Sequence, residues 1–418
     1  MRESGQNGQG LEWRVTFLRN KKGGEMKVLL LGIGMQGKAA LHDLVRSKRV
    51  TEIVAADRDL SALRSHVESK RYTAKVRCEL VDAANPARLD RLMKEGPDVA
   101  IDLMPVLFHN SVASAAVKNS VHLVNASYAT PEMKDLSDRA KAKGVTILPE
   151  FGMDPGIDLV LLGQAVRSLD HVEEIITYGA GFPEPEAADN ALKYKVTWTF
   201  EGVLKSYRRA GRVIRDGEIV EIGDTEMFNP EHTHEIELEG LGKLEAFPNG
   251  DALKYADLLG LEKSSLRNMG RYVLRWPGHC AFWKTMVDLH LLDDEPVSMD
   301  GVKIDRQRFL AAAITPHIQY GDDERDVVVV RIEVVGSKDG KKMRAIHQVI
   351  DRRDLETGFT AMSRTVGYTA SIGAQMIATG KIRKRGLLSP VNDTPYELFA
   401  QELRKRDIRI TSEVVACD

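Results

Sequence analysis

The stretch KVLLLGIGMQGK, residues 27–38, is an apolar run that ends directly in three glycines. The run has the length and leucine-rich character of a buried strand, and the spacing Gly32-x-Gly34-x-x-Gly37 follows it at once. Residues 37–48 then repeat apolar side chains at helical spacing. Such a glycine loop lets backbone amides approach a pyrophosphate, which the positive end of the helix stabilises. The stretch therefore predicts a dinucleotide-binding site.

The same order of strand, turn and helix recurs through the first half of the chain. Further apolar runs are EIVAAD (52–57), KVRCELVD (75–82), DVAIDLMP (98–105), VHLVNAS (121–127) and VTILPE (145–150). Because these runs are continuous rather than alternating, helices should cover both faces of the sheet, as in a parallel sheet. We predict an α/β fold with a Rossmann-type, doubly wound parallel sheet over residues 26–154.

The second half of the chain has alternating, strand-rich segments instead, at residues 171–182, 235–248, 271–278, 325–336 and 341–351. The last two flank the sequence SKDG, which is typical of a hairpin turn. These segments predict an inserted α+β domain of mostly antiparallel strands over residues 155–354, which binds the substrate. Residues 355–418, with a long helix of small residues, are expected to return to the Rossmann domain, and residues 1–25 form a polar extension.

Composition excludes several classes of function. With 418 residues, 43% of them hydrophobic, the chain can bury a core larger than one ordinary domain needs. The net charge of −2 and the lack of a basic, aromatic-rich stretch argue against nucleic-acid binding. No signal peptide or bilayer-spanning run is evident, and Cys78, Cys280 and Cys417 are too far apart for a disulfide framework or zinc knuckle. We expect a cytoplasmic protein with no membrane partner.

The cofactor should bind where the carboxyl ends of the parallel strands meet. Asp57 ends the second strand, at the distance where an acidic residue meets the adenosine ribose. Its carboxylate accepts hydrogen bonds from ribose hydroxyls and repels a 2′-phosphate, which favours NAD, although the adjacent Arg58 leaves NADP open. Asp82 either faces the adenine or caps a turn. The expected cofactor-binding residues are Gly32, Gly34, Met35, Gln36, Gly37, Asp57, Arg58, Asp82, Leu103, Met104, Pro105, Gly152, Met153 and Asp154.

The last of these strands runs into an unusual turn in VTILPEFGMDPGID, residues 145–158. Asp154 followed by Pro155 is typical of a helix start, with Asp as the N-cap and Pro at the first helical position. The same Asp154 also lies just past a parallel strand, where the nicotinamide should rest, and the two roles are compatible. Glu150 and Asp158 are expected to be solvated or capping charges.

Several unusual strings together resemble the saccharopine dehydrogenase family, in particular its glutamate-forming reductases. In order along residues 26–416, they are LGIGMQG, MPVLFH, SYATPEM, EFGMDPGID, GFPEPEAADNALKYKVTW, RDVVVVRIEV, RGLLSPVN and SEVVA. The resemblance implies the NAD(P)-dependent oxidation of a secondary amine in lysine metabolism, or its reverse. Hydride leaves the carbon next to nitrogen, water attacks the iminium, and the carbinolamine breaks into glutamate and aminoadipate semialdehyde. The resemblance also implies a homodimer.

Site residues follow from the same resemblance. The Ser-Tyr pair that touches the substrate falls on Ser127 and Tyr128, and Tyr128 and Asp154 are expected to orient the amine and relay protons. Trp198 matches an aromatic residue near the nicotinamide. His109 and His279 are further candidates for proton transfer, with a helix cap as the plainer role of His109. The expected substrate-binding residues are Ser127, Tyr128, Asn190, Tyr194, Lys195, Trp198, Arg271 and Arg275.

Two features depart from the family pattern. The fungal enzymes have an arginine in a Y-P-N-R-D string that clamps a substrate carboxylate, whereas this chain reads FPNGD, with Gly250 in that place. Arg271, Lys254 or Lys195 are candidates to replace the missing cation. The segment 291–324 is also much shorter than the helical insertion of the fungal enzymes, so the cover over the substrate should differ.

Three alternatives remain at this point. Lysine 6-dehydrogenase, a relative, pairs an acidic residue like Asp57 with NAD and has an R-x-x-G-H string like Arg275 to His279. A non-catalytic nicotinamide-binding module would need the glycine loop and Asp57 but not Ser127, Tyr128 and Asp154 together. A metal hydrolase is the third alternative. The sequence HTH at 232–234 puts two histidines on one face of a strand but lacks a third ligand at a recognisable spacing, so we expect surface residues and no metal site.

Overall fold

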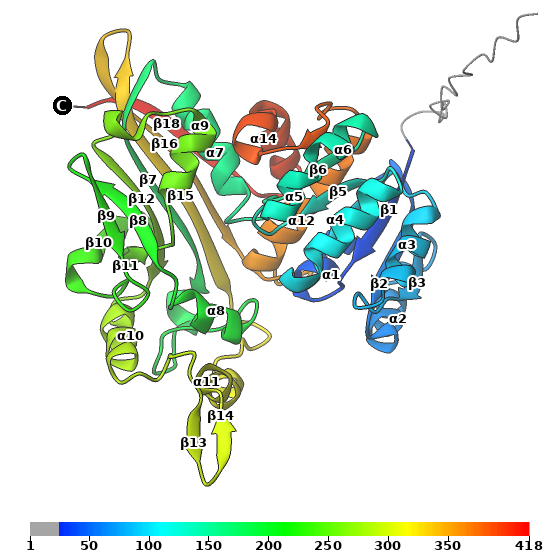
Figure 1. The fold of residues 1–418 in the computed structure, drawn as a ribbon, viewed down its shortest axis with the longest axis horizontal. Helices are drawn as coiled ribbons and strands as arrows, with labels where there is room; N and C mark the ends of the chain where they lie inside the picture. The colour runs from blue at the N-terminus through cyan, green and yellow to red at the C-terminus, as the bar shows by residue number, and fades with distance from the viewer. Residues whose placement is uncertain (1–24, 418) are drawn as a thin grey trace, which may run out of the picture.

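The computed structural model describes residues 25–417, so the predicted polar extension lies outside them except for Glu25 (Figure 1). The first domain is a seven-stranded parallel sheet in the order β17-β6-β5-β4-β1-β2-β3, which confirms the predicted Rossmann-type fold. Its strands are β1 (Met26–Leu31), β2 (Val50–Asp57), β3 (Val76–Leu80), β4 (Val99–Asp102), β5 (His122–Asn125), β6 (Thr146–Leu148) and β17 (Gly386–Leu387).

Helices cover both faces of this sheet, which explains why its strands are continuously apolar. In β1, Val28 and Leu30 join a core with α1, α2 and α12, whereas Leu29 and Leu31 join a second core with α3 and α4 on the other face. The helices are α1 (Met35–Arg46), α2 (Leu60–Ser69), α3 (Pro86–Lys94), α4 (His109–Lys118), α5 (Pro131–Asp135), α6 (Ser137–Ala142) and α12 (Ala361–Ala378).

The second domain is a nine-stranded mixed sheet in the order β10-β11-β12-β7-β15-β16-β18, in which β8 also pairs with β12 and β9 pairs with β8. Adjacent strands of this sheet pair in antiparallel fashion, except β7 and β12, which are parallel. The strands are β7 (His171–Pro183), β8 (Gly211–Arg215), β9 (Glu218–Ile222), β10 (His234–Leu238), β11 (Gly242–Pro248), β12 (Asn268–Arg275), β15 (Asp326–Lys338), β16 (Lys341–Arg352) and β18 (Ile410–Ala416). The predicted hairpin turn joins β15 to β16 through Asp339 and Gly340, both at positive φ.

Helices and one projecting hairpin complete the second half of the chain (Figure 1). The helices are α7 (Ile157–Arg167), α8 (Phe200–Ser206), α9 (Leu253–Leu259), α10 (His279–Asp288), α11 (Arg306–Ile314), α13 (Pro390–Asp393) and α14 (Tyr396–Arg404). The hairpin is β13 (Val297–Met299) with β14 (Val302–Ile304). Short 3₁₀ turns lie at Val106–Phe108, Pro185–Ala187, Pro230–His232, Lys263–Ser265 and Thr315–His317.

The C-terminal part of the chain contributes to both sheets. Helix α12 packs on α1, where the Ser371 hydroxyl donates to Asp43 Oδ2 at 2.6 Å, and β17 extends the parallel sheet. Strand β18 instead pairs with β16 of the second sheet, which departs from the expectation that the whole of 355–418 packs on the Rossmann domain. The cysteines are free thiols. Within residues 25–417, no helix is both long and apolar enough to span a bilayer.

Candidate active site

The glycine loop has the shape that a dinucleotide needs. A Cβ at Gly32, where φ is 85°, would lie 2.7 Å from the carbonyl carbon and oxygen of Leu103, and one at Gly37 would lie 2.0 Å from the Gly32 carbonyl oxygen. Gly34, in contrast, faces open space and precedes α1, and no side chain of the described residues caps this end of the helix. The loop thus leaves the helix N-terminus open to a pyrophosphate.

Asp57 lies against this loop at the end of β2. Its Oδ2 accepts a hydrogen bond from Ile33 N at 2.6 Å and its Oδ1 accepts one from Asp59 N at 3.0 Å, so the loop fixes the orientation of the carboxylate. Arg58 beside it is exposed. Asp82 is also exposed and accepts a hydrogen bond from Ala84 N at 3.0 Å, which is the turn-capping role considered from the sequence.

The loops after β5 and β6 run side by side at the same edge of the sheet. Glu150 N donates to Ser127 O at 2.8 Å, and Phe151 N donates to Asn125 O at 2.9 Å. These hydrogen bonds bring the segment with Tyr128 next to the segment with Gly152, Met153 and Asp154. Tyr128 and Asp154 therefore lie at the same edge of the parallel sheet, as we expected for residues that follow the carboxyl ends of neighbouring strands.

A buried arginine from the second domain joins these loops. Arg271, on β12, pairs through Nη2 with Asp154 Oδ1 and with Asp158 Oδ2, the latter at 2.9 Å. Its Nη1 donates to Tyr255 Oη at 2.9 Å and lies 3.5 Å from Tyr128 Oη. Arg271 and Asp158 are each 4% exposed and Tyr255 is 0% exposed, whereas Asp154 and Tyr128 are partly exposed. The cluster of two carboxylates, two phenols and one guanidinium is therefore mostly buried. The two domains meet at this cluster.

One prediction about this turn is wrong, and another holds only in part. Helix α7 begins at Ile157 after Gly156, so Asp154 is not its N-cap, because the Asp154 carboxylate is engaged by Arg271 and by Asn249 Nδ2 at 3.2 Å. Asp158 is not solvated: it is 4% exposed, and while its Oδ2 pairs with Arg271, its Oδ1 accepts from Gly156 N at 2.6 Å, which is a capping contact. Glu150 is buried as well.

Burial shifts the pKa values of groups in the cluster and of the neighbouring Lys254. It raises the pKa of the Tyr128 phenol, although the Arg271 charge opposes the shift. Burial and the Asp154 charge raise the pKa of Asp158. Lys254 Nζ lies 4.0 Å from the centre of the Tyr128 ring, and burial followed by repulsion from Arg271 lowers the pKa of Lys254 to about 8. The site thus combines a neutral phenol with an ammonium that titrates near neutrality.

A second series of hydrogen-bonded polar groups connects Ser127 to the buried Asp102 through His109. His109 Nδ1 lies 2.7 Å from Asp102 Oδ2, and His109 Nε2 lies 2.9 Å from Ser127 Oγ. Asp102 and His109 are 0% and 1% exposed, whereas Ser127 is partly exposed. The imidazole begins α4, but its ring connects a buried carboxylate to a hydroxyl at the site instead of capping the helix. This is an arrangement able to carry a proton.

Four predicted substrate residues have structural contacts elsewhere in the second domain. Asn190 Oδ1 accepts hydrogen bonds from Leu192 N and Tyr194 N, and its Nδ2 donates to Tyr194 O, so it closes a turn. Arg275 lies over the Tyr194 ring at 5.0 Å. Lys195 pairs with Glu324 and, at 2.9 Å, with Asp189. The role of these residues in substrate binding stays a prediction.

Trp198 lies at the rim between the domains. Gln36 Nε2, in the glycine loop, lies 3.3 Å from Thr197 O, so the segment before α8 touches the cofactor domain. The Trp198 side chain is 42% exposed and lies against Gly202, where an added Cβ would meet its ring at 2.6 Å. An exposed indole beside the glycine loop fits the predicted place near the nicotinamide, which stays a prediction.

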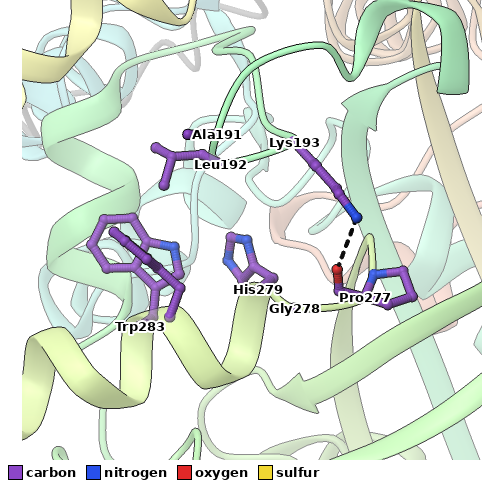
Figure 2. A pocket seen from close by; sticks show the side chains of 8 residues that line it. Ala191, Leu192, Lys193, Pro277, Gly278, His279 and Trp283 are labelled. Carbon is purple, nitrogen blue, oxygen red and sulfur yellow. Dashed lines mark hydrogen bonds between the residues drawn. The ribbon is translucent and has the colours of Figure 1, made fainter.

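His279 does not lie in this site. Figure 2 shows it at the start of α10, in a small pocket with Trp283 and with Lys193, whose Nζ is 3.5 Å from Pro277 O. Its Nε2 lies 2.9 Å from the Tyr207 hydroxyl, and burial holds the pKa of His279 well below its ordinary value. No residue of the Arg271 cluster lines the pocket, so His279 is a neutral side chain of the aromatic core.

The two histidines of HTH belong to different elements. His232 is in a 3₁₀ turn and is 9% exposed, so the prediction of a surface residue is wrong for it. His234, on β10, is exposed, with Nε2 3.1 Å from Tyr178 Oη. Among residues 25–417, no group of three or more His, Cys, Asp and Glu side chains could hold a metal ion.

Sequence reasoning missed three of these groups. Asn249, in the quoted string FPNGD, binds Asp154, and Tyr255 binds Arg271. A Cβ at Gly179, on β7, would lie 2.1 Å from Asp154 Oδ2, so the carboxylate packs directly on the strand backbone. Only the string FPNGD gave a signal in the sequence.

Comparison with known proteins assigns the chain to a family. Residues 28–148 match the family described as Saccharopine dehydrogenase NADP binding domain, and residues 152–408 match the Saccharopine dehydrogenase C-terminal domain. The chain belongs to the saccharopine dehydrogenase family. Its N-terminal domain is accordingly a nicotinamide dinucleotide-binding domain, which agrees with the open glycine loop.

Two curated members of the saccharopine dehydrogenase family illustrate the relationship. Saccharopine dehydrogenase [NADP(+), L-glutamate-forming] of Saccharomyces cerevisiae is 26% identical over 458 residues, covering 93% of this chain and 99% of the yeast protein. Alpha-aminoadipic semialdehyde synthase of Mus musculus is 26% identical over 457 residues, covering 94% of this chain. The chain spans 48% of the length of that mouse protein.

A solved structure of the family supports the fold. The apo L-Glu-forming saccharopine dehydrogenase from Saccharomyces cerevisiae superposes with a TM-score of 0.82, covering 94% of this chain and 100% of the yeast chain at 23% identity. The parallel sheet and the second, mostly antiparallel sheet are therefore the architecture of a family member.

Proposed function

We propose that this protein is an NAD(P)-dependent oxidoreductase that acts on a CH–NH bond in lysine metabolism. It oxidises saccharopine to glutamate and aminoadipate semialdehyde, or catalyses the reverse. The yeast relative is a saccharopine dehydrogenase that forms L-glutamate, and the mouse relative is an alpha-aminoadipic semialdehyde synthase, which supports this substrate and these products. The observation that carries the proposal is the buried cluster of Arg271, Asp154 and Tyr128 beside the open glycine loop.

The glycine loop and the start of α1 hold the dinucleotide, which accepts the hydride when it is bound. Asp57 accepts hydrogen bonds from the ribose hydroxyls, so we propose a preference for NAD. The exposed Arg58 is the group that would accept a 2′-phosphate, and the description of the family domain names NADP. The ratio of kcat/KM for the two cofactors tests this proposal.

Tyr128 and Asp154 orient the substrate amine. Asp154, held by Arg271 and Asn249, presents a carboxylate that accepts the amine proton, directly or through water. The Tyr128 phenol, neutral because burial raises its pKa, donates a hydrogen bond. Ser127 orients the attacking water and passes a proton to His109 Nε2, while Asp102 stabilises the resulting imidazolium.

One assay tests the proposal. The purified protein is incubated with NAD or NADP and with saccharopine, lysine or related amines, and the absorbance of the reduced cofactor is followed. We expect turnover with saccharopine. Turnover with lysine alone would replace this function with that of a lysine 6-dehydrogenase, and turnover only with NADP would overturn the role given to Asp57. Cofactor binding without turnover of any amine would favour a non-catalytic module.

We further propose that the protein acts in the cytoplasm as a homodimer. The free thiols of Cys78, Cys280 and Cys417 fit a reducing compartment, and the broad sheet of the second domain offers a surface for a second copy. Light scattering on the purified protein measures the mass in solution. A monomer at micromolar concentration would contradict the dimer.

A further inference from the structure

The space beside Gly250 is filled by an arginine from another part of the chain. Gly250 follows Asn249 at the end of β11 and has φ of 68°, a conformation that favours glycine. A Cβ at this position would lie 2.9 Å from Arg209 Cδ, so the side chain of Arg209, from the segment between α8 and β8, lies across the glycine. Arg209 therefore brings a positive charge to the place where the sequence lacks one.

Asn249 connects Arg209 to the candidate active site. Arg209 Nη1 lies 3.5 Å from Asn249 Oδ1, and Asn249 Nδ2 donates to Asp154 Oδ2 at 3.2 Å. The side-chain amide of Asn249 thus connects the Arg209 guanidinium to the Asp154 carboxylate, and Arg209 itself is exposed. Arg209 also acts on Lys254, because its charge is among the causes that lower the pKa of that ammonium.

Arg209 differs from the neighbouring cations in having no carboxylate partner among residues 25–417. Arg208 pairs with Asp224 and Asp293, and Arg212 pairs with Asp251. The candidate replacements Arg271 and Lys195 are likewise paired with carboxylates of the chain itself. Of the guanidinium donors of Arg209, one makes a single long contact to an amide oxygen, so a bidentate face remains for a ligand.

We propose that Arg209 binds a carboxylate of the substrate and selects amines that carry one on this side of the site. The inference rests on the proposed function and extends it to specificity. Lys254, which lies over Tyr128 and has no carboxylate partner in the described chain, is the second cation of this subsite. Saccharopine carries more carboxylates than lysine, because a dicarboxylate is attached to the lysine nitrogen. Arg209 is therefore the residue that discriminates between the two amines.

The experiment compares Arg209→Ala and Arg209→Lys with the unchanged protein. Steady-state kinetics with saccharopine give kcat and KM, and calorimetry on the dinucleotide-saturated protein gives the Kd of glutarate, a dicarboxylate probe. For Arg209→Ala we expect KM and this Kd to rise at least about tenfold, with kcat within about twofold, because a charge-assisted contact made in both ground and transition states is lost. Arg209→Lys should recover part of the loss, since it keeps the charge without the fork.

Lys205→Ala is the matched control, because Lys205 is an exposed cation on α8 that pairs with Glu201. It should leave KM and glutarate binding unchanged. Equal KM and equal glutarate Kd in Arg209→Ala and the unchanged protein would overturn the inference. If saccharopine is not turned over at all, the proposed function fails, whereas glutarate binding that depends on Arg209 still supports a carboxylate subsite. Glutarate binding that ignores Arg209, or no binding, rejects the subsite.

Discussion

At the scale of single residues, Arg271 organises the site. It is buried against two carboxylates and two phenols, and removing one member of such a cluster leaves the others with uncompensated charge. The charges of Asp154 and neighbouring groups raise the pKa of Arg271 well above its ordinary value, although burial alone would lower it. The guanidinium is therefore a permanent cation, and the groups around it supply whatever proton transfer the reaction needs.

Replacing Asp154 tests its catalytic role. We expect Asp154→Asn to lower kcat by about 10² or more, because an amide no longer accepts the amine proton. The Kd of the dinucleotide should change little, since the hydrogen bonds of this carboxylate are made with Arg271 and Asn249 of the second domain. Stopped-flow turnover and cofactor fluorescence measure the two quantities. Asp257→Asn, at an exposed carboxylate of α9, is the control, and an undiminished kcat in Asp154→Asn would contradict the role.

The titration of Lys254 predicts a pH dependence of substrate binding. Below pH about 8 the ammonium is charged and attracts a substrate carboxylate, and above it the charge is lost, so KM for saccharopine should rise as the pH passes about 8. Lys254→Met should have a higher KM with a flatter profile. Parallel pH profiles of the two proteins would contradict the assignment.

The lowered pKa of Lys254 also predicts how the stability of the folded protein depends on pH. Because the folded pKa of Lys254 is about 8 and its ordinary value is 10.5, the unfolded chain binds the proton more tightly. The cost of burying the charge is fully present below pH about 8 and is relieved as the pH rises toward 10.5. The stability of the unchanged protein relative to Lys254→Met should therefore increase over this range. Denaturant unfolding of both proteins measures the difference.

At the scale of elements, the contact between α1 and α12 supports the glycine loop. A Cβ at Gly367, on α12, would lie 2.4 Å from Gln36 O and 2.8 Å from Ala40 N, and both of these are backbone atoms. The helices can approach this closely only with glycine at the contact. A helix from the C-terminal part of the chain thus holds the helix whose N-terminus faces the cofactor.

Gly367→Ala should separate these helices. We expect a loss of about 1–3 kcal/mol in the free energy of unfolding from the overpacked contact, and weaker dinucleotide binding because α1 shifts. Urea denaturation and cofactor titration test both effects. Gly380→Ala is a control for overpacking, because a Cβ at Gly380, just after α12, would lie in open space. Its φ of 70° adds a backbone cost that is separate from packing. Unchanged stability in Gly367→Ala would contradict the close packing.

At the scale of the whole molecule, the C-terminal part completes both domains. Helix α12 is largely buried and β17 extends the parallel sheet, whereas β18 is a mostly exposed edge strand of the second sheet. A protein that ends at residue 354 loses α12 and exposes the apolar face of α1, so it should lack cooperative thermal unfolding. A protein that ends at residue 409 loses only β18 and should unfold cooperatively. Circular dichroism melts distinguish them, and a cooperative transition in the shorter protein would contradict this account.

The sequence by itself determined the glycine loop, the parallel strands and the edge at which Tyr128 and Asp154 meet. These features follow from local patterns, since apolar periodicity defines strands and helices and the ends of parallel strands share one edge. The comparison with the family string showed that Gly250 stands where a cation is expected, but the replacements considered from the sequence did not include Arg209. The strings resembling a known family placed the remaining site residues only by analogy.

Only the tertiary structure decided which charges meet. Arg271 binds Asp154 and Asp158 from more than a hundred positions away along the chain, and Arg209 reaches Gly250 from the segment between α8 and β8. Asp154 looks like a helix cap in the sequence because capping is a local pattern. In the structure its carboxylate instead pairs with Arg271, a buried arginine of the second domain. Side-chain pairing across domains depends on how the two sheets dock, and no local periodicity carries that information.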